Sequence, residues 1–172
     1  VPPATVKKAF QYLDTVQANS GANYGYTDPG AGQATTAIGL LCRMYLGWKK
    51  DNPALQRGVK WIGQQGPAIN AGAETANMYY NYYATQVLHH YQGDAWETWH
   101  PTIRDYLIES QVKEGHRSGS WYFDGDFGSP TGGRLYITAL STMVLEVYYR
   151  HMPIYTEDAV VQAWPTRDAE AN

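Results

Sequence analysis

Residues 57–65 read RGVKWIGQQ, in which a basic residue is followed by the aromatic-aliphatic pair Trp61-Ile62 and then by Gln65. The same order, from basic to aromatic-aliphatic to glutamine, returns in residues 7–17 and in residues 104–111. Self-similarity at a spacing of roughly 45–50 residues is typical of proteins built from stacked helical units. We therefore take this pattern as the starting point for the fold.

Each copy of the pattern lies in a segment whose apolar residues recur at helical spacing, so that they share one side of a helix. These amphipathic segments are residues 6–17, 53–65 and 99–110. Each is followed by a loop and then by a mostly apolar segment, namely residues 34–48, 78–91 and 135–149. A helix that is apolar around most of its circumference is buried on several sides. The pattern predicts outer helices alternating with inner ones.

The sequence therefore predicts an all-α fold of three helical hairpins, with about six main helices. We assign one repeat domain to residues 1–154, with units at about 4–50, 53–93 and 97–152. The tail, residues 155–172, breaks the repeat. We expect it to be either a strap across an open edge or unordered, and its apolar residues favour the strap.

The composition narrows the classes of function. The chain has 172 residues, of which 44% are hydrophobic, enough for a real core. Only 17% are charged, while tyrosine alone supplies 15 residues. The formal net charge of -3 leaves no basic footprint for a nucleic acid, and charged or polar residues interrupt every apolar run that could span a membrane. The aromatic excess indicates an aromatic core or an aromatic-lined cavity.

Cofactor and metal motifs are missing from the sequence. Cys42 is the only cysteine, so no internal disulfide and no cysteine-based zinc site can form. There is no phosphate-cradling Gly-x-x-x-x-Gly-Lys and no dinucleotide fingerprint. We expect no cofactor and no metal. The chain starts at Val1-Pro2-Pro3 without a methionine, which suggests a fragment or a mature chain.

The repeated pattern resembles the QW motif of the terpenoid cyclase and protein prenyltransferase superfamily, the prenyltransferase/squalene oxidase repeat. Arg57-Gly58-x-x-Trp61-Ile62-x-x-Gln65 is similar to its first half, and Leu107-x-x-x-Gln111 followed by Gly119-Ser120-Trp121 is similar to its second half. The resemblance covers about residues 4–152. In such a motif the glutamine can hydrogen-bond the adjoining loop while the loop aromatic stacks nearby.

The resemblance implies an α/α toroid in which inner helices line a central aromatic cavity. A complete ring of this kind has about six hairpins, so the three predicted here form half of one. Half a ring leaves an apolar edge, which another domain, a second copy or the tail would cover.

Motifs for the chemistry of that superfamily are absent. Cyclases that protonate squalene carry Asp-x-Asp-Asp, whereas the nearest stretches here are Asp28-Pro29-Gly30 and Asp124-Gly125-Asp126, which lack adjacent carboxylates. No aspartate stands just before Cys42, as a prenyltransferase zinc site would require, and the magnesium motif Asp-Asp-x-x-Asp is missing. Catalytic residues are therefore not assigned.

A candidate ligand site lies where the inner helices begin, because in the toroid these ends would converge on one mouth of the cavity. Its residues are Asp28, Glu74, Asn77, Tyr79, Tyr83, Trp121, Asp124, Asp126, Arg134 and Tyr136. Tyr79 and Tyr83 share a helix face at i, i+4. Tyrosine in place of phenylalanine favours a polar-lined concavity over a dry core.

The same residues have a purely structural interpretation. Asp28, Glu74 and Asn77 are typical helix caps or first-turn residues. Asp124 and Asp126 can form turns around glycine, or can bind a cation or a sugar. Residues 131–134, Thr-Gly-Gly-Arg, can be a tight helix start or an anion seat beside Arg134.

Three functions stay open on the sequence alone. The first is a repeat module that binds a small amphipathic or aromatic ligand, or a partner, on its concave face. The second is a fragment of a larger cyclase- or prenyltransferase-like enzyme with its chemistry in the missing half ring. The third is part of a carbohydrate-active α/α barrel, since aromatic platforms with carboxylates also suit sugars.

Overall fold

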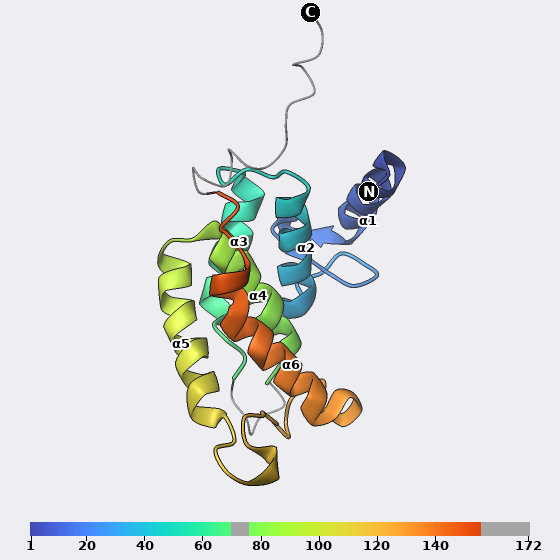
Figure 1. Ribbon diagram of the computed structural model, residues 1–172. Helices are drawn as coiled ribbons and strands as arrows, with labels where there is room; N and C mark the ends of the chain where they lie inside the picture. Colours follow the sequence, from blue (N-terminus) through green and yellow to red (C-terminus); the bar gives the residue numbers. More distant parts are fainter. Residues whose placement is uncertain (70–75, 156–172) are drawn as a thin grey trace, which may run out of the picture.

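The computed structural model describes residues 1–69 and 76–155 and is built almost entirely from helices (Figure 1). The α-helices are α1 (Pro3–Val16), α2 (Gln33–Tyr45), α3 (Pro53–Gln65), α4 (Met78–Tyr91), α5 (Asp94–Ser110) and α6 (Ser129–Arg150). Short 3-10 turns occupy Asn19–Gly21 and Gly115–Arg117, and β1 (Gln17–Ala18) pairs antiparallel with β2 (Asn23–Tyr24). The all-α prediction is confirmed. The ring arrangement stays a prediction.

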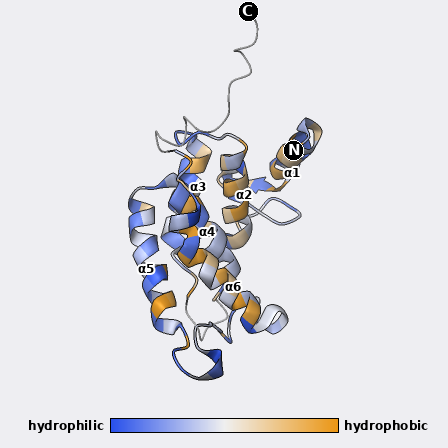
Figure 2. Ribbon diagram, viewed as in Figure 1, coloured by the Kyte–Doolittle hydropathy of each residue, from blue (hydrophilic) through white to orange (hydrophobic). Residues whose placement is uncertain are grey.

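Helix α4 lies at the centre of the molecule. It contacts α2 on one side and α6 on the other, and it also touches α3 and α5 (Figure 1). Ten of its 14 residues are buried, whereas the outer side of α5 is largely hydrophilic (Figure 2). The prediction that mostly apolar segments form the inner helices is therefore confirmed for α4.

Helix ends follow local signals in the sequence. Asn52 caps α3, because its side-chain oxygen accepts hydrogen bonds from the amides of Ala54 and Leu55 at 2.9 and 3.3 Å. Pro53 then occupies the first helical position, as expected. Helix α5 begins at Asp94, five residues earlier than the predicted start at residue 99. Its interior Pro101 is exposed, so that side of the helix faces water.

Helix α6 is broken near its start. Gly133 has φ 59° inside the stretch assigned to α6, so the regular helix begins at about Arg134. This agrees with the predicted inner helix at residues 135–149. The four residues before the break form a separate turn that carries the chain out of the 121–128 loop.

One contact recurs in all three helical hairpins and joins each inner helix to the loop before it. A polar side chain on the inner helix hydrogen-bonds both the N–H and the C=O of a single loop residue. The pairs are Thr36 with Tyr24, Asn81 with Ala68, and Thr138 with Trp121, with N–H to side-chain oxygen distances of 3.1, 2.8 and 3.1 Å. We call these contacts the loop clamps.

The glutamine that ends the last outer helix reaches the loop after it. The Gln111 side-chain amide donates to the carbonyl of Gly119 at 3.1 Å, and the Trp121 indole donates to the carbonyl of Leu107 at 2.7 Å. In this third unit two hydrogen bonds, one from Gln111 and one from Trp121, thus join the outer helix to the loop. Gln17 instead pairs with Tyr24 through the backbone of the small sheet.

Helix α1 is the least buried of the six. Among its residues only Leu13 and Val16 are buried. It is held to α2 by Arg43, which is 3% exposed and bonds the Asp14 carboxylate at 2.5 Å. The Arg43 guanidinium also lies 5.5 Å from the centre of the Phe10 ring. A buried cation thus anchors a helix that otherwise stands at the edge (Figure 1).

After α6 the chain turns back over the C-terminal end of α4. The carbonyl of His151 hydrogen-bonds the His89 ring at 2.6 Å, and the Tyr155 hydroxyl donates to the carbonyl of Trp48 at 2.6 Å. Residues 151–155, which we call the strap, therefore connect the third hairpin to the loop between α2 and α3. The rest of the predicted tail, residues 156–172, lies outside the described residues. No helix in the described part is long and apolar enough to cross a membrane.

Candidate functional site

Helix α4 presents a group of tyrosines along one side. Tyr79, Tyr82 and Tyr83 are half-buried. The Tyr83 ring meets those of Tyr79 and Tyr82 edge to face, with ring centres 4.9 Å apart in both cases. Tyr79 and Tyr83 share a face, as predicted. Tyr80 lies in the core instead, where its ring meets that of Trp99 at 5.8 Å.

Tyrosines from the two neighbouring inner helices extend this group. Tyr45 of α2 interacts with Tyr82, and Tyr136 of α6 interacts with Tyr79. We call Tyr45, Tyr79, Tyr82, Tyr83 and Tyr136 the tyrosine face. Its members come from α2, α4 and α6 and lie up to 91 positions apart in the sequence.

Burial keeps the phenols of Tyr45, Tyr83 and Tyr136 neutral at physiological pH, because it raises the pKa of each. The pKa of Tyr83 is raised to about 12, mainly by burial and to a smaller extent by a hydrogen bond with Tyr79. Burial likewise raises the pKa of Tyr45 and of Tyr136. Neutral hydroxyls can donate or accept hydrogen bonds while the rings offer apolar area. The face therefore suits a ligand with both aromatic and polar parts.

A pocket of about 240 Å³ opens at the α1 end of the tyrosine face. Its lining residues are Tyr12, Leu13, Val16, Tyr24, Gly25, Tyr26, Thr35, Ile38, Gly39 and Tyr79. The Tyr12 hydroxyl donates to the carbonyl of Tyr26 at 2.5 Å across its rim. No acidic or basic side chain lines it, so it favours an uncharged group.

Asp126, a predicted ligand residue, is a structural cap. Its carboxylate is 3% exposed and accepts the amide of Met78 at 2.6 Å and the amide of Gly128 at 2.8 Å. It therefore caps the start of α4 from a loop of the third hairpin. Asn77 caps the same helix, since its side chain accepts from the amide of Tyr80 at 2.9 Å. The structural interpretation of Asp126 and Asn77 is the one that their contacts support.

The other predicted acids do not join Asp126. Asp124 is exposed. Asp28 is also exposed and accepts from the hydroxyl of its neighbour Thr27 at 2.9 Å. Glu74 lies outside the described residues. The structure thus brings Tyr79, Tyr83 and Tyr136 together, and within residues 1–69 and 76–155 no pair of free carboxylates lies beside them.

Trp121 and Arg134 are occupied by internal contacts. Trp121 is 4% exposed, so it is a core residue and offers no ligand surface. The Arg134 guanidinium donates to the Ser120 hydroxyl at 3.1 Å and stands over the Tyr122 ring at 5.2 Å. These contacts hold Arg134 against the loop before α6, where the sequence suggested an anion seat.

A cluster of histidines that the sequence did not predict lies at the C-terminal end of α4. The ring centres of His89 and His90 are 5.8 Å apart, and those of His90 and His151 are 5.7 Å apart. The His90 ring also bonds the Tyr45 hydroxyl at 3.1 Å. Only the placement of His151 by the strap reveals this cluster. Among residues 1–69 and 76–155, no group of three or more His, Cys, Asp or Glu side chains could hold a metal ion.

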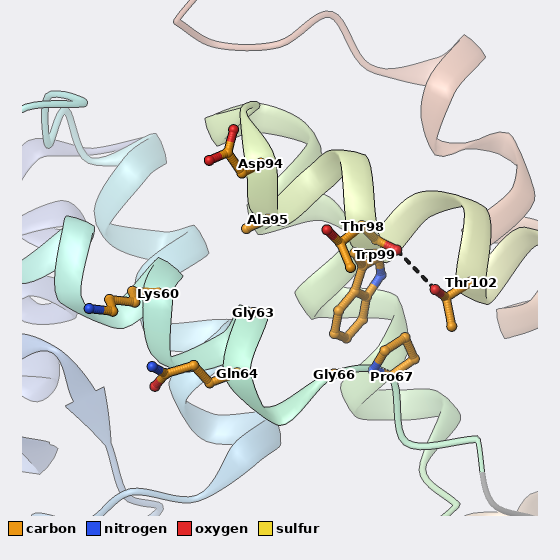
Figure 3. A pocket seen from close by; sticks show the side chains of 10 residues that line it. All are labelled: Lys60, Gly63, Gln64, Gly66, Pro67, Asp94, Ala95, Thr98, Trp99 and Thr102. Carbon is orange, nitrogen blue, oxygen red and sulfur yellow. Dashed lines mark hydrogen bonds between the residues drawn. The ribbon is translucent and has the colours of Figure 1, made fainter.

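A second hollow lies on the outer layer, between α3 and α5 (Figure 3). It has a volume of about 310 Å³, and Gly63 and Ala95 line it where the two helices pass each other. Lys60 and Asp94 also line it, from α3 and α5. It belongs to the outer helices and is separate from the tyrosine face.

We compared the chain with protein-family models, with curated proteins and with solved structures, and none of them matches it. Its function is therefore argued from its own residues.

Proposed function

We propose that this chain is a helical repeat module that binds a small amphipathic or aromatic ligand on the tyrosine face. The observation that supports this most directly is that Tyr79, Tyr82 and Tyr83 of α4 pack together while only half-buried, with Tyr45 of α2 and Tyr136 of α6 near enough to interact with them. A purely structural core would bury these rings fully, as it does Tyr80, which is 0% exposed.

The chemistry of the face limits the ligand. The half-buried, edge-to-face tyrosines of α4 offer both exposed ring surface and hydroxyl groups. The pocket beside Tyr79 adds an uncharged recess of about 240 Å³, large enough for a single ring system. A flat ligand that inserts an aromatic part and directs polar groups to the phenols fits this arrangement.

The test is binding of the aromatic, amphipathic dye anilinonaphthalene sulfonate, followed by its fluorescence. We expect Tyr83→Ala and Tyr79→Ala to weaken dye binding at least about tenfold, equivalent to about 1.4 kcal/mol. Tyr83→Phe, which keeps the ring, should weaken it less. The control is Phe127→Ala, because Phe127 is an exposed aromatic residue, 78% exposed, that belongs neither to the tyrosine face nor to the pocket beside it. Equal binding by all four variants would contradict the proposal.

The three loop clamps support the proposal that the chain is a three-unit repeat, as the resemblance to the prenyltransferase/squalene oxidase repeat implies. In each hairpin a polar side chain of the second helix, threonine or asparagine, bonds the backbone of the loop before that helix. A second candidate is that the chain is a fragment of a larger enzyme that resembles the cyclases and prenyltransferases. Its test is the length of the natural reading frame, which should extend well beyond these 172 residues.

The carbohydrate-active interpretation loses its main support. Glycoside hydrolysis needs two carboxyl groups facing each other across a groove. Asp126 is buried and bonded to two backbone amides, so it cannot serve as a partner for Asp124. We therefore do not propose a sugar-cleaving site at this loop.

A further inference from the structure

Three histidines meet where the strap crosses the C-terminal end of α4, and we call His89, His90 and His151 the histidine cluster. His89 and His90, on the helix, are each 2% exposed. His151 belongs to the strap, and its ring centre lies 5.7 Å from that of His90. The strap therefore lies directly against a pair of buried imidazoles.

Neither buried ring has a partner for a second proton. The His89 Nε2–H donates to the carbonyl of His151 at 2.6 Å, and the His90 Nε2 bonds the Tyr45 hydroxyl at 3.1 Å. The Nδ1 atoms of both rings are buried and have no hydrogen-bond partner among the described residues. An imidazolium has two N–H donors. Protonation of either ring would thus bury a positive charge and leave a donor without an acceptor.

The surroundings of the cluster also favour neutral rings. Burial, together with His89 and His151, lowers the pKa of His90 to about 4, and the backbone of Met152 raises it to a smaller extent. Burial, followed by His89 and Arg150, lowers the pKa of His151. The neighbours that act most on these two rings are therefore bases, whose positive charges would repel an added proton.

Other titratable groups stand on each element packed against the cluster. They are Tyr45 on α2, His100, Arg104 and Asp105 on α5, Glu146, Tyr148 and Arg150 on α6, and Tyr155 in the strap. The carboxylate of Asp105 acts on the pKa of His100, and that of Glu146 bonds Arg150 at 3.5 Å. Neither carboxylate is among the groups that set the pKa of His90.

The strap is held lightly. None of residues 151–155 is buried, and Met152 is 59% exposed. The strap is attached by the bond from His89 to the carbonyl of His151 and by the bond from Tyr155 to the carbonyl of Trp48. Release of such a segment gives up little buried area, and it would let water reach the rings of the cluster.

We propose that the strap is an acid-released latch, in which protonation of the histidine cluster detaches residues 151–155 from α4 while the helices stay folded. The closed strap requires neutral rings, because it buries them without acceptors for both N–H groups. The released strap leaves them in contact with water, where the imidazolium is solvated. The release needs no ligand, so it is independent of the binding proposed for the tyrosine face.

Linkage gives the direction and size of the effect. The pKa of His90 is about 4 with the strap closed, and we take its ordinary value of 6.5 for the released form. Release is therefore suppressed above about pH 6.5 and grows as the pH falls toward 4. With these two values the ratio of released to closed strap rises about twentyfold between pH 7 and pH 5.

The methyl NMR signals of the methionines test the proposal in the whole chain. Met152 lies in the strap, whereas Met78 is 1% exposed in the core. As the pH is lowered from 7 to 4.5, we expect the Met152 signal to move reversibly to the position of an unstructured chain. The Met78 signal should keep its folded position throughout.

Removal of the titrating rings should abolish this transition. In His90→Gln with His151→Gln we expect the Met152 signal to be independent of pH over the same range, while Met78 reports that the core is folded. His116→Gln is the control, because His116 is exposed and lies outside the cluster. It should leave the transition unchanged.

Tyr155→Phe tests the latch without changing a histidine. It removes the hydroxyl that bonds Trp48, and the loss of one hydrogen bond should raise the ratio of released to closed strap about fivefold. Because one proton drives release, the midpoint should rise by about 0.7 pH unit. Tyr12→Phe, which removes a tyrosine bond to the carbonyl of Tyr26, is the matched control and should not move it.

Three results would overturn the proposal. The first is a Met152 signal that changes only together with that of Met78, because the strap would then open only when the core unfolds. The second is an unaltered Met152 transition in the variant that lacks both histidines. The third is the same midpoint for Tyr155→Phe and Tyr12→Phe.

Discussion

Asp126 shows how one residue can carry two opposite interpretations. In the sequence it stands two positions from Asp124, among aromatic residues, as in many cation or sugar sites. In the structure its carboxylate bonds the amide of Met78 at the start of α4 and the amide of Gly128 in its own loop. A buried carboxylate that satisfies two backbone donors is held in place by them and has a structural role.

Removal of this carboxylate should destabilise the fold. Asp126→Ala leaves two buried amides without an acceptor, which costs about 1–3 kcal/mol of the free energy of unfolding. Urea unfolding measures this change. Asp124→Ala is the matched control, because Asp124 is exposed, and it should alter stability by no more than about 0.5 kcal/mol. If the two variants lost equal stability, the capping role of Asp126 would be wrong.

At the scale of elements, the loop clamps hold each loop in one position on the helix that follows it. Each inner helix uses one polar side chain to bond both backbone groups of a loop residue. Asn81 does this while it is 0% exposed. Because a buried backbone group without a partner is costly, each clamp favours a single position of the loop on its helix.

Thr138→Val tests the clamp in the third hairpin. Valine keeps the branched shape and removes the hydroxyl that bonds Trp121, so we expect a loss of about 1 kcal/mol or more. Thermal unfolding measures it. Thr142→Val, one turn later on the same helix, removes a hydroxyl that bonds only the carbonyl of Thr138, and it should cost clearly less. The reverse order would argue against the clamp.

At the scale of the whole molecule, the strap joins the end of the third hairpin to the loop between α2 and α3, and histidines mediate the join. His90 lies among His89, His151 and Tyr45, with its ring 2% exposed. The pKa of His90 is lowered from its ordinary 6.5 to about 4. Burial is the largest cause, and the neighbouring His89 and His151 add to it. Burial also lowers the pKa of His151 and of His100.

The protein should therefore become less stable in mild acid. Between pH 6.5 and pH 4 the unfolded chain binds a proton at residue 90 that the folded chain does not, so the stabilising contribution is complete above about pH 6.5 and is lost as the pH falls toward 4. Urea unfolding across this range should show the loss. His90→Gln should flatten the dependence, whereas His116→Gln, at an exposed position, should not. An equal effect of the two variants would contradict this account.

The helices themselves follow from local sequence. The 3.6-residue spacing of apolar side chains predicts each of them, and Asn52-Pro53 predicts where α3 begins, because these signals act within one or two turns. Helix ends that carry no such signal were harder to predict. Helix α5, for example, begins five residues before the predicted start. The pairing of Tyr79 with Tyr83 was also predictable, since it lies within one helix.

The sequence by itself determined the all-α class, the burial of α4, and the pairing of Tyr79 with Tyr83 on one side of that helix. The tertiary structure alone decided that Asp126 caps a helix 48 residues away, that His89 meets His151 across 62 residues, and that tyrosines of α2 and α6 join those of α4. The physical reason is the sequence distance over which each kind of interaction acts. Helical periodicity is set by neighbours a turn apart, whereas the partner of a buried polar group is set by whichever distant segment the packing brings within hydrogen-bonding distance.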